Sequence, residues 1–264
     1  LAASNRSARP HSPPCYFSAI DTMPLVHTDT GPVLGYTRGA CTTFRAIPYA
    51  EPPVGSLRFR PPVPIRAWAG VRDASDGVVE CVQTPDANSY GLPGWAERLE
   101  EAIAGVSRRT MNEDCLTLTV STPDVHSSLP VMLYIHGGSF LSGNSNLSGA
   151  AHVVCSRGIV VVSINYRLGV LGNLALPELL AESGTTGNYG LQDQREAMRW
   201  VRRNAHAFGG DASRVTLSGE SAGAMSVIAH LALPRSTSLF AQAIAASTVQ
   251  PRNSEGRLFT PAAV

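Results

Sequence analysis

The sequence lacks three features that would assign it at once to a class of protein. No apolar run in its 264 residues approaches the ~20 residues that span a bilayer, so we predict no transmembrane segment. The formal net charge is +1 and charges of both signs are interspersed, which argues against nucleic acid as a partner. The five cysteines cannot all pair within the chain, and they lie too far apart for a C-x-x-C zinc or redox site; they are Cys15, Cys41, Cys81, Cys115 and Cys155.

The N-terminal residues lack the apolar h-region of a signal peptide. The chain starts at Leu1, and residues 1–14 are rich in serine, arginine and proline. We therefore expect residues 1–22 to be a disordered or mispredicted leader. This composition leaves the cellular compartment open.

After residue 115 the sequence alternates between apolar β-rich runs and helical patterns. Residues 190–207 form the clearest helical pattern, with four apolar side chains on one face: Ala197, Trp200, Val201 and Ala205. Three consecutive valines at 160–162 indicate a strand buried on both faces, as in a parallel sheet covered by helices. The β-rich runs span residues 115–123, 131–135, 158–166, 215–219 and, as the weakest, 240–247. We predict an α/β fold with a mostly parallel central sheet.

The N-terminal part of the chain has a different pattern. Residues 24–39, continued by 41–50, alternate with Gly and Thr punctuation, which predicts a short antiparallel meander leading into the sheet. Residues 51–64 contain too many prolines for a helix or a central strand, so we expect an extended surface crossing. Residues 81–115 are predicted to be a loop with one helical candidate at 94–106.

The stretch VTLSGESAGA, residues 215–224, predicts a strand that ends in Gly-x-Ser-x-Gly and continues as a helix of small residues. This is how a nucleophilic serine, here Ser221, is presented at a sharp turn. The bare pattern is weak, since it arises by chance in roughly one chain in ten of this length. The alternative is a plain Gly/Ser turn at a helix N-cap, but the strand before the pattern and the small residues after it favour the nucleophile.

A second glycine motif follows the predicted strand at 131–135. The run continues as His136-Gly137-Gly138-Ser139, whose glycines would let backbone N–H groups turn toward a developing oxyanion. Two of these N–H groups and that of Ala222 would form a hole with three donors. Each preorganised donor of this kind typically stabilises a transition state by about 3 kcal/mol. The alternative is a glycine-rich strand exit that binds nothing.

Ordered motifs across residues 24–247 resemble the type-B carboxylesterase and cholinesterase family. The motifs are IPYAEPPVGSLRFRPP (47–62), NEDCLTLTV (112–120), HGGSF (136–140), INYRLGVLGNL (164–174) with GNYGLQDQREAMRWVRRNAHAFGGD (187–211), and FGGDASRVTLSGESAG (208–223). The resemblance implies an α/β-hydrolase fold. It also implies hydrolysis of carboxylic esters through an acyl group bound to the serine.

The resemblance assigns roles to individual residues. Ser221 would be the nucleophile, and the N–H groups of Gly138, Ser139 and Ala222 would hold the oxyanion. Ser139 stands where the family usually has a third glycine, which a backbone donor tolerates if its φ/ψ suits a residue with a Cβ. Glu220 matches a glutamate that lines the pocket near the histidine; the alternative is an exposed turn carboxylate.

The family also links cysteines that match Cys81 and Cys115, closing an Ω-like loop. A disulfide that closes a loop of this length would stabilise the fold by about 3 to 4 kcal/mol on the chain-entropy model. If it forms, it argues for an oxidising compartment and points to the secretory pathway.

The residues after Ser221 do not complete a catalytic triad. In α/β-hydrolases the acid and then the histidine follow the serine, and here only Glu255 and His230 come after it. His230 lies nine residues along the predicted helix, about 13 Å from its start and on the opposite side, so it cannot be the base. His136 belongs to the oxyanion motif and is expected to be structural.

We therefore expect a fragment, in which residues 23–247 are the N-terminal part of a carboxylesterase domain and residues 248–264 are a divergent tail. Alone, it should turn over little or no ester and leave the strand at 158–166 at an exposed sheet edge. No metal or cofactor is implied, the expected partner is a small-molecule ester, and the exact substrate and oligomeric state stay open. Two alternatives remain. One is a catalytically inactive esterase-like binding or adhesion protein, against which the intact Ser221 argues, and the other is a lipase acting at interfaces.

Overall fold

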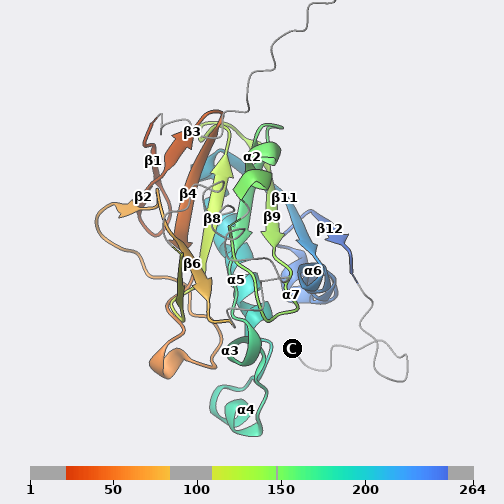
Figure 1. Cartoon of the computed structure of the whole chain (residues 1–264). Helices are drawn as coiled ribbons and strands as arrows, with labels where there is room; N and C mark the ends of the chain where they lie inside the picture. Colours follow the sequence, from red (N-terminus) through yellow and green to blue (C-terminus); the bar gives the residue numbers. More distant parts are fainter. Residues whose placement is uncertain (1–21, 84–108, 147, 249–264) are drawn as a thin grey trace, which may run out of the picture.

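The computed structural model describes residues 22–83, 109–146 and 148–248 (Figure 1). The expected leader up to residue 21, the helical candidate at 94–106 and the tail from residue 249 lie outside the described residues. Within the described ranges, no helix has the length and apolar content needed to cross a membrane.

A seven-stranded sheet forms the centre of the structure, in the order β12-β11-β9-β10-β8-β4-β3. Its strands are β3 (Tyr36–Arg38), β4 (Cys41–Pro48), β8 (Thr117–Thr122), β9 (Leu129–Ile135), β10 (Val160–Ile164), β11 (Gly210–Glu220) and β12 (Gln242–Ala246). Strands β10, β9, β11 and β12 pair in parallel, whereas β10–β8, β8–β4 and β4–β3 are antiparallel. The described part of the sheet is therefore evenly mixed rather than mostly parallel.

Helices connect or precede the parallel strands of the sheet, because parallel strands need a crossover connection. The helices are α2 (Ser148–Cys155), α3 (Gly169–Asn173), α4 (Pro177–Ser183), α5 (Tyr189–Asn204), α6 (Ala222–Ala232) and α7 (Pro234–Thr237), with short 3-10 turns η1 (Gly55–Leu57) and η3 (Ala205–Phe208). Helix α2 connects β9 to β10, α5 precedes β11, and α6 connects β11 to β12. Figure 1 shows α2 in front of the sheet and α5 behind it.

The N-terminal strands form two antiparallel pairs in separate sheets instead of one meander. Strand β1 (Leu25–His27) pairs with β2 (Pro32–Leu34), and β2 also pairs with β5 (Arg72–Asp73), while β3 and β4 join the central sheet. Gly35 separates them; a Cβ there would lie 2.6 Å from the carbonyl oxygen of Thr43. This close approach lets the chain pass from one sheet to the other. A third, parallel pair joins β6 (Val78–Cys81) to β7 (Arg109–Asn112).

The core confirms the burial predicted for one helix face and one strand. The four apolar residues of the predicted helix face, Ala197, Trp200, Val201 and Ala205, are all at most 4% exposed, and every residue of β10 is buried. The prediction that the strand at 158–166 lies at an exposed edge is wrong, because β10 pairs with β8 on one side and β9 on the other. Among the described strands the two edges of this sheet are β12 and β3, and all five residues of β12 are exposed.

Two disulfides connect the described segments. Cys41 at the start of β4 bonds to Cys155 at the end of α2, across 114 residues of sequence, and Cys81 at the end of β6 bonds to Cys115. The second pair is the one that the resemblance implied. The first had no local signal, since sequence spacing alone does not determine disulfide connectivity.

Candidate functional site

Ser221 occupies the turn between β11 and α6. The strand ends at Glu220 and the helix begins at Ala222, so Ser221 is the only residue between them. Its backbone has φ 54° and ψ −118°, a combination that residues with a Cβ rarely adopt. Strain of this kind costs about 1 to 3 kcal/mol and persists only where surrounding contacts fix it.

Two glycines supply those contacts. A Cβ on Gly219 would lie 2.4 Å from the carbonyl carbon of Gly223, and a Cβ on Gly223 would lie 2.1 Å from the carbonyl oxygen of Ile135 on β9. A larger residue at either position would open the turn or push α6 away from β9. The geometry is the sharp strand-to-helix turn that the Gly-x-Ser-x-Gly pattern predicts.

His136–Phe140, which we call the glycine loop, leaves the sheet beside Ser221. Strands β9 and β11 are parallel, and Ile135 pairs with Gly219. The chain therefore leaves both strands at their carboxyl ends, on the same side of the sheet (Figure 1). A Cβ built on Gly137 would lie 3.2 Å from the Cβ of Ser221. The structure therefore brings the two glycine motifs of the sequence into contact.

The glycine loop has an unusual backbone. Gly138, Ser139 and Phe140 have φ values of 93°, 56° and 60°. Ser139 thus adopts a left-handed conformation at the position where the family usually has glycine, at a cost of roughly 1 kcal/mol. The carbonyl oxygen of Gly138 accepts hydrogen bonds from the N–H groups of Leu141, at 2.9 Å, and Ser142, at 3.0 Å, which closes the loop into a turn.

Three backbone donors near Ser221 are available. The N–H groups of Gly138, Ser139 and Ala222 have no hydrogen-bond acceptor among the residues that the structure describes. Ala222 is also the first residue of α6, where the helix dipole favours negative charge. These are the three donors that the sequence predicts for an oxyanion hole.

His136 is the first residue of the glycine loop, and its side chain is buried. Burial lowers its pKa from 6.5 to about 4, so the ring is neutral at pH 7. Its Nδ1 lies 2.9 Å from the carbonyl oxygen of Gly137, which fixes the proton on Nδ1, and the ring stacks on Tyr166 with 4.4 Å between centroids. The Tyr166 hydroxyl donates to the carbonyl oxygen of His136. Sequence reasoning missed Tyr166, because a hydroxyl bonded to a distant carbonyl leaves no spacing pattern.

His230 is held away from Ser221. It is fully buried, with Nε2 3.0 Å from Gln194 Oε1 on α5 and Nδ1 3.0 Å from the Ser236 hydroxyl on α7. Gln194 donates in turn to Ser226, which donates to the carbonyl oxygen of Ala222. Since the Gln194 oxygen can only accept, His230 carries its proton on Nε2, and burial lowers its pKa to about 3. Both ring nitrogens are occupied, which agrees with the expectation that His230 is not the base.

Glu220 is exposed and lies beside the glycine loop. A Cβ on Gly137 would lie 2.8 Å from Glu220 Oε2. The charge of Glu220 also contributes, after burial, to the raised pKa of Tyr134 on β9. This position suits a residue that borders a pocket, although its exposure also fits a turn carboxylate.

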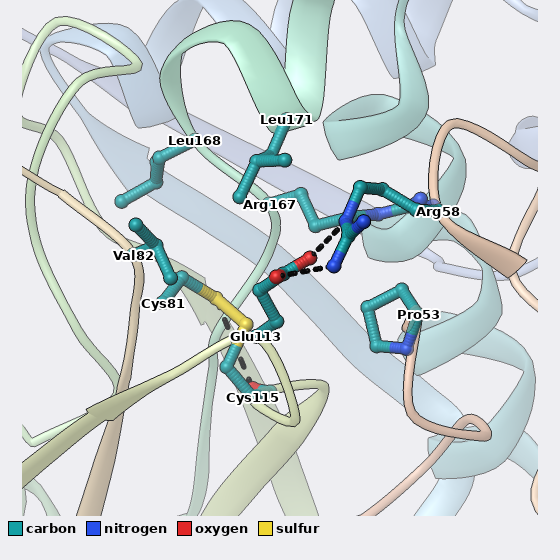
Figure 2. Close-up of a pocket in the computed structure, with 9 residues that line it drawn as sticks. All are labelled: Pro53, Arg58, Cys81, Val82, Glu113, Cys115, Arg167, Leu168 and Leu171. Atoms are coloured by element: carbon teal, nitrogen blue, oxygen red, sulfur yellow. Dashed lines mark hydrogen bonds and ion pairs between the residues drawn. A yellow bond between two sulfur atoms is a disulfide. The ribbon is translucent and has the colours of Figure 1, made fainter. Parts of the chain in front are cut away.

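A pocket lies beside the Cys81–Cys115 disulfide (Figure 2). Its lining residues are Pro53, Arg58, Cys81, Val82, Glu113, Cys115, Arg167, Leu168 and Leu171. Figure 2 shows Glu113 turned toward Arg58, with which it forms a two-pronged pair at 2.6 and 2.7 Å that lowers the pKa of the carboxyl. Arg167 forms a second such pair with the fully buried Asp193.

Metal ligands do not gather in the described ranges, where no group of three His, Cys, Asp or Glu residues could hold an ion. The residues near Ser221 instead offer backbone donors and a hydroxyl. That arrangement suits covalent catalysis at a carbonyl carbon.

Comparison with known proteins agrees with this chemistry. The chain is 44% identical over 227 residues to the fumonisin B1 esterase of Sphingopyxis macrogoltabida, covering 83% of this chain and 38% of that protein. It is 41% identical over 239 residues to the acylcarnitine hydrolase of Mus musculus, covering 87% and 41% of the two chains. It is also 41% identical over 236 residues to the cocaine esterase of Homo sapiens, covering 86% and 40%. The chain thus spans about two fifths of the length of these relatives.

The sequence profile of the carboxylesterase family matches residues 22–253, which include β1 to β12, Ser221 and the glycine loop. On this match and on the identities above, the chain belongs to the carboxylesterase family.

Proposed function

We propose that this chain carries the nucleophile and the oxyanion hole of a serine hydrolase of carboxylic esters. The observation that supports this most is the contact between the two glycine motifs: Gly137 lies against Ser221, and the unoccupied N–H groups belong to Gly138, Ser139 and Ala222. A serine in a strained turn beside three free backbone donors has the arrangement that acyl transfer requires.

In this mechanism the Ser221 hydroxyl oxygen attacks the ester carbonyl carbon while its proton passes to a general base. The carbonyl oxygen becomes an oxyanion held by the N–H groups of Gly138, Ser139 and Ala222. The tetrahedral intermediate collapses, the alcohol leaves with a proton, and the acyl group stays on Ser221. Water then attacks the acyl-enzyme and releases the carboxylic acid.

We propose that the base and the acid come from sequence beyond these 264 residues. Both nitrogens of His230 are engaged in the contact between α5, α6 and α7, and His136 donates to its own loop. The relatives are more than twice as long as the part they share with this chain, which leaves room for both partners. Without a base a serine hydroxyl is a weak nucleophile, so we expect little or no turnover from the chain alone.

The substrate class is a small carboxylic ester. Fumonisin B1 esterase, acylcarnitine hydrolase and cocaine esterase are named for esters that differ widely in size and charge, so the names support the ester bond rather than one substrate. Glu220, exposed beside Gly137, would border the pocket that receives it.

Covalent labelling tests the assignment without requiring turnover. The chain is incubated with a fluorophosphonate, and the modified serine is located by mass spectrometry. We expect slow labelling at Ser221 in preference to every other serine, because an oxyanion hole alone retains about 10³ to 10⁴ of rate over water. The Ser221→Ala variant should lose this adduct and gain none elsewhere.

Labelling spread evenly over exposed serines would contradict the proposal and favour the alternative of an esterase-like protein that binds without catalysis. Sequencing the transcript through the codon for Val264 tests the second part. If the reading frame continues to a carboxylate and then a histidine, the longer protein should label Ser221 about 10² to 10⁴ times faster, which is the usual contribution of a general base. An in-frame stop there would refute the proposed source of the base.

A further inference from the structure

The chain just after the glycine loop is held by the side chain of Gln83. The N–H of Gly143 donates to Gln83 Oε1 at 2.9 Å, and Gln83 Nε2 donates to the Gly143 carbonyl oxygen at 3.0 Å. One side-chain amide thus pairs with both polar groups of one residue, as a neighbouring strand would. Nε2 also donates to the carbonyl oxygen of Cys81, at 3.1 Å, which holds the amide in place.

Two further links join the same segments. Asn144 Nδ2 donates to Glu80 Oε1 at 2.8 Å. Asn165, at the end of β10, accepts from the N–H of Ser145 and donates to the carbonyl oxygen of Val79. Residues 80 and 83 therefore bond directly to residues 144 and 143, and Asn165 bridges Val79 to Ser145. The disulfide of Cys81 fixes this segment to Cys115, and both sulfur-bearing residues are buried.

Gly143 transmits its position to the glycine loop. A Cβ on Gly143 would lie 2.1 Å from His136 Nδ1, so this residue is wedged between the His136 ring and the Gln83 amide. Its neighbour Ser142 donates its N–H to Gly138, and a Cβ on Gly138 would lie 2.2 Å from the Ser142 carbonyl oxygen. A shift of Gly143 would therefore displace Gly138 through one intervening residue, Ser142.

We propose that Gln83 is a positioning residue for the oxyanion hole: by clamping Gly143 to the disulfide-bonded strand β6, it fixes where the Gly138 and Ser139 N–H groups lie. The proposal rests on the proposed function, because only an oxyanion hole needs this precision. A displacement of about 1 Å from a position outside the reacting groups can cost about 10²-fold in rate. Gln83 does not contact substrate in this scheme.

The variant Gln83→Glu tests the clamp because it keeps the side chain's length. The ionised carboxylate can accept from the Gly143 N–H but cannot donate to the Gly143 and Cys81 carbonyl oxygens, and it would repel both. The protonated carboxyl is a near copy of the amide and restores one donor. The matched control is Gln242→Glu, the same change at an exposed glutamine on β12.

Hydrogen exchange of single amides measures the clamp without any activity. In Gln83→Glu near pH 7 we expect the N–H groups of Leu141, Ser142 and Gly143 to exchange roughly fivefold faster than in the parent chain, the effect of losing about one net hydrogen bond. As the pH falls through the pKa of the introduced carboxyl, which the two facing carbonyls raise, the difference should disappear. Unchanged exchange in α5 and β9 shows that the variant is folded.

Fluorophosphonate labelling of Ser221 measures the consequence. Each labelling rate is compared with that of the parent at the same pH. We expect Gln83→Glu to label at least about tenfold more slowly near pH 7 and to approach the parent rate at the lower pH. The loss should be smaller than that from removing one oxyanion donor outright, which lowers the rate by about 10² to 10³. Gln242→Glu should match the parent throughout. Faster exchange confined to the Gly143 N–H, or faster exchange across the loop with unchanged labelling, would overturn the proposal, since Gln83 would then be only structural. If Ser221 of the parent fails to label, the proposed function fails, and exchange at Leu141 and Ser142 alone decides whether Gln83 positions the loop.

Discussion

Two buried histidines should make this protein sensitive to mild acid. Burial lowers the pKa of His136 from 6.5 to about 4 and that of His230 from 6.5 to about 3. Both therefore stay neutral in the folded protein at a pH where the unfolded chain binds a proton. The perturbation that exposes this difference is a change from about pH 7.5 to about pH 5.

The sign and size follow from proton linkage. Because the unfolded state binds more protons than the folded state between pH 6.5 and the folded pKa values, stability is present above pH 6.5 and is lost as the pH falls. At pH 5 both histidines in the folded protein are still above their pKa and remain neutral. The loss of unfolding free energy therefore depends only on the 1.5 pH units between pH 5 and the unfolded pKa of 6.5. At 1.36 kcal/mol per unit this is about 2 kcal/mol for each histidine and about 4 kcal/mol for both.

Denaturant unfolding at the two pH values, followed by tryptophan fluorescence, measures the loss. The variant His230→Gln removes one titrating group, so its loss of unfolding free energy should shrink from about 4 to about 2 kcal/mol. Comparing the two pH values within each variant cancels the stability that the substitution itself costs at neutral pH. The control is His126→Gln, at an exposed histidine, which should keep the full loss.

The strongly stabilised carboxylate of Asp211 does not mimic this result. Hydrogen bonds from Ser213 and Arg214 lower the pKa of Asp211 to about 2, and its stabilisation is therefore lost only at much more acid pH. The reasoning is refuted if His230→Gln loses as much stability as the parent protein, or if the parent loses less than about 1 kcal/mol. Either result would mean that the folded state accommodates the charged imidazole.

Three further substitutions test the backbone and the covalent links. Gly223→Ala should destabilise by about 3 kcal/mol or more in denaturant unfolding, because its Cβ would meet the Ile135 carbonyl at 2.1 Å, whereas Gly39→Ala, with positive φ and open space, should cost about 1 kcal/mol. The free energy of unfolding of Ser221→Gly should exceed that of Ser221→Ala by about 1 kcal/mol or more, because both variants lack the hydroxyl and only alanine keeps the strained Cβ. Equal unfolding midpoints would show that the turn is unstrained. Cys41→Ser should cost roughly 5 kcal/mol through the long loop that its disulfide closes, and a midpoint unchanged from the oxidised parent would show that the bond does not form.

The parts of the fold that the sequence predicts are those where local chemistry leaves little choice. Helix α5 follows its apolar spacing, and three consecutive valines place β10 in the core. The turns around Ser221 and Gly138 are marked by glycines because the backbone there approaches other backbone too closely for a side chain. Local patterns of this kind are readable from one sequence.

The parts that the sequence missed depend on partners far away in the chain. Nothing in the run at 158–166 says that β8 pairs with it, so its place inside the sheet was not predictable. The Cys41–Cys155 disulfide and the Gln83 clamp on Gly143 likewise join segments whose separation follows no period. Strand order, disulfide pairing and side-chain bonds to distant backbone are set by tertiary packing, and the local patterns of a single sequence do not reveal them.

Contacts with other described residues hold the turn at Ser221. Gly219 meets Gly223, Gly223 meets Ile135, and the Ser221 N–H donates to the carbonyl oxygen of Ala246 on β12. Packing of α6 against β9 and β11 thus offsets the 1 to 3 kcal/mol that such a backbone costs. Since the strained turn and the neighbouring backbone N–H groups are already in place in this chain, we expect labelling at Ser221 to report on the proposed nucleophile and oxyanion hole, and the rate gained with a longer chain to report on the proposed base.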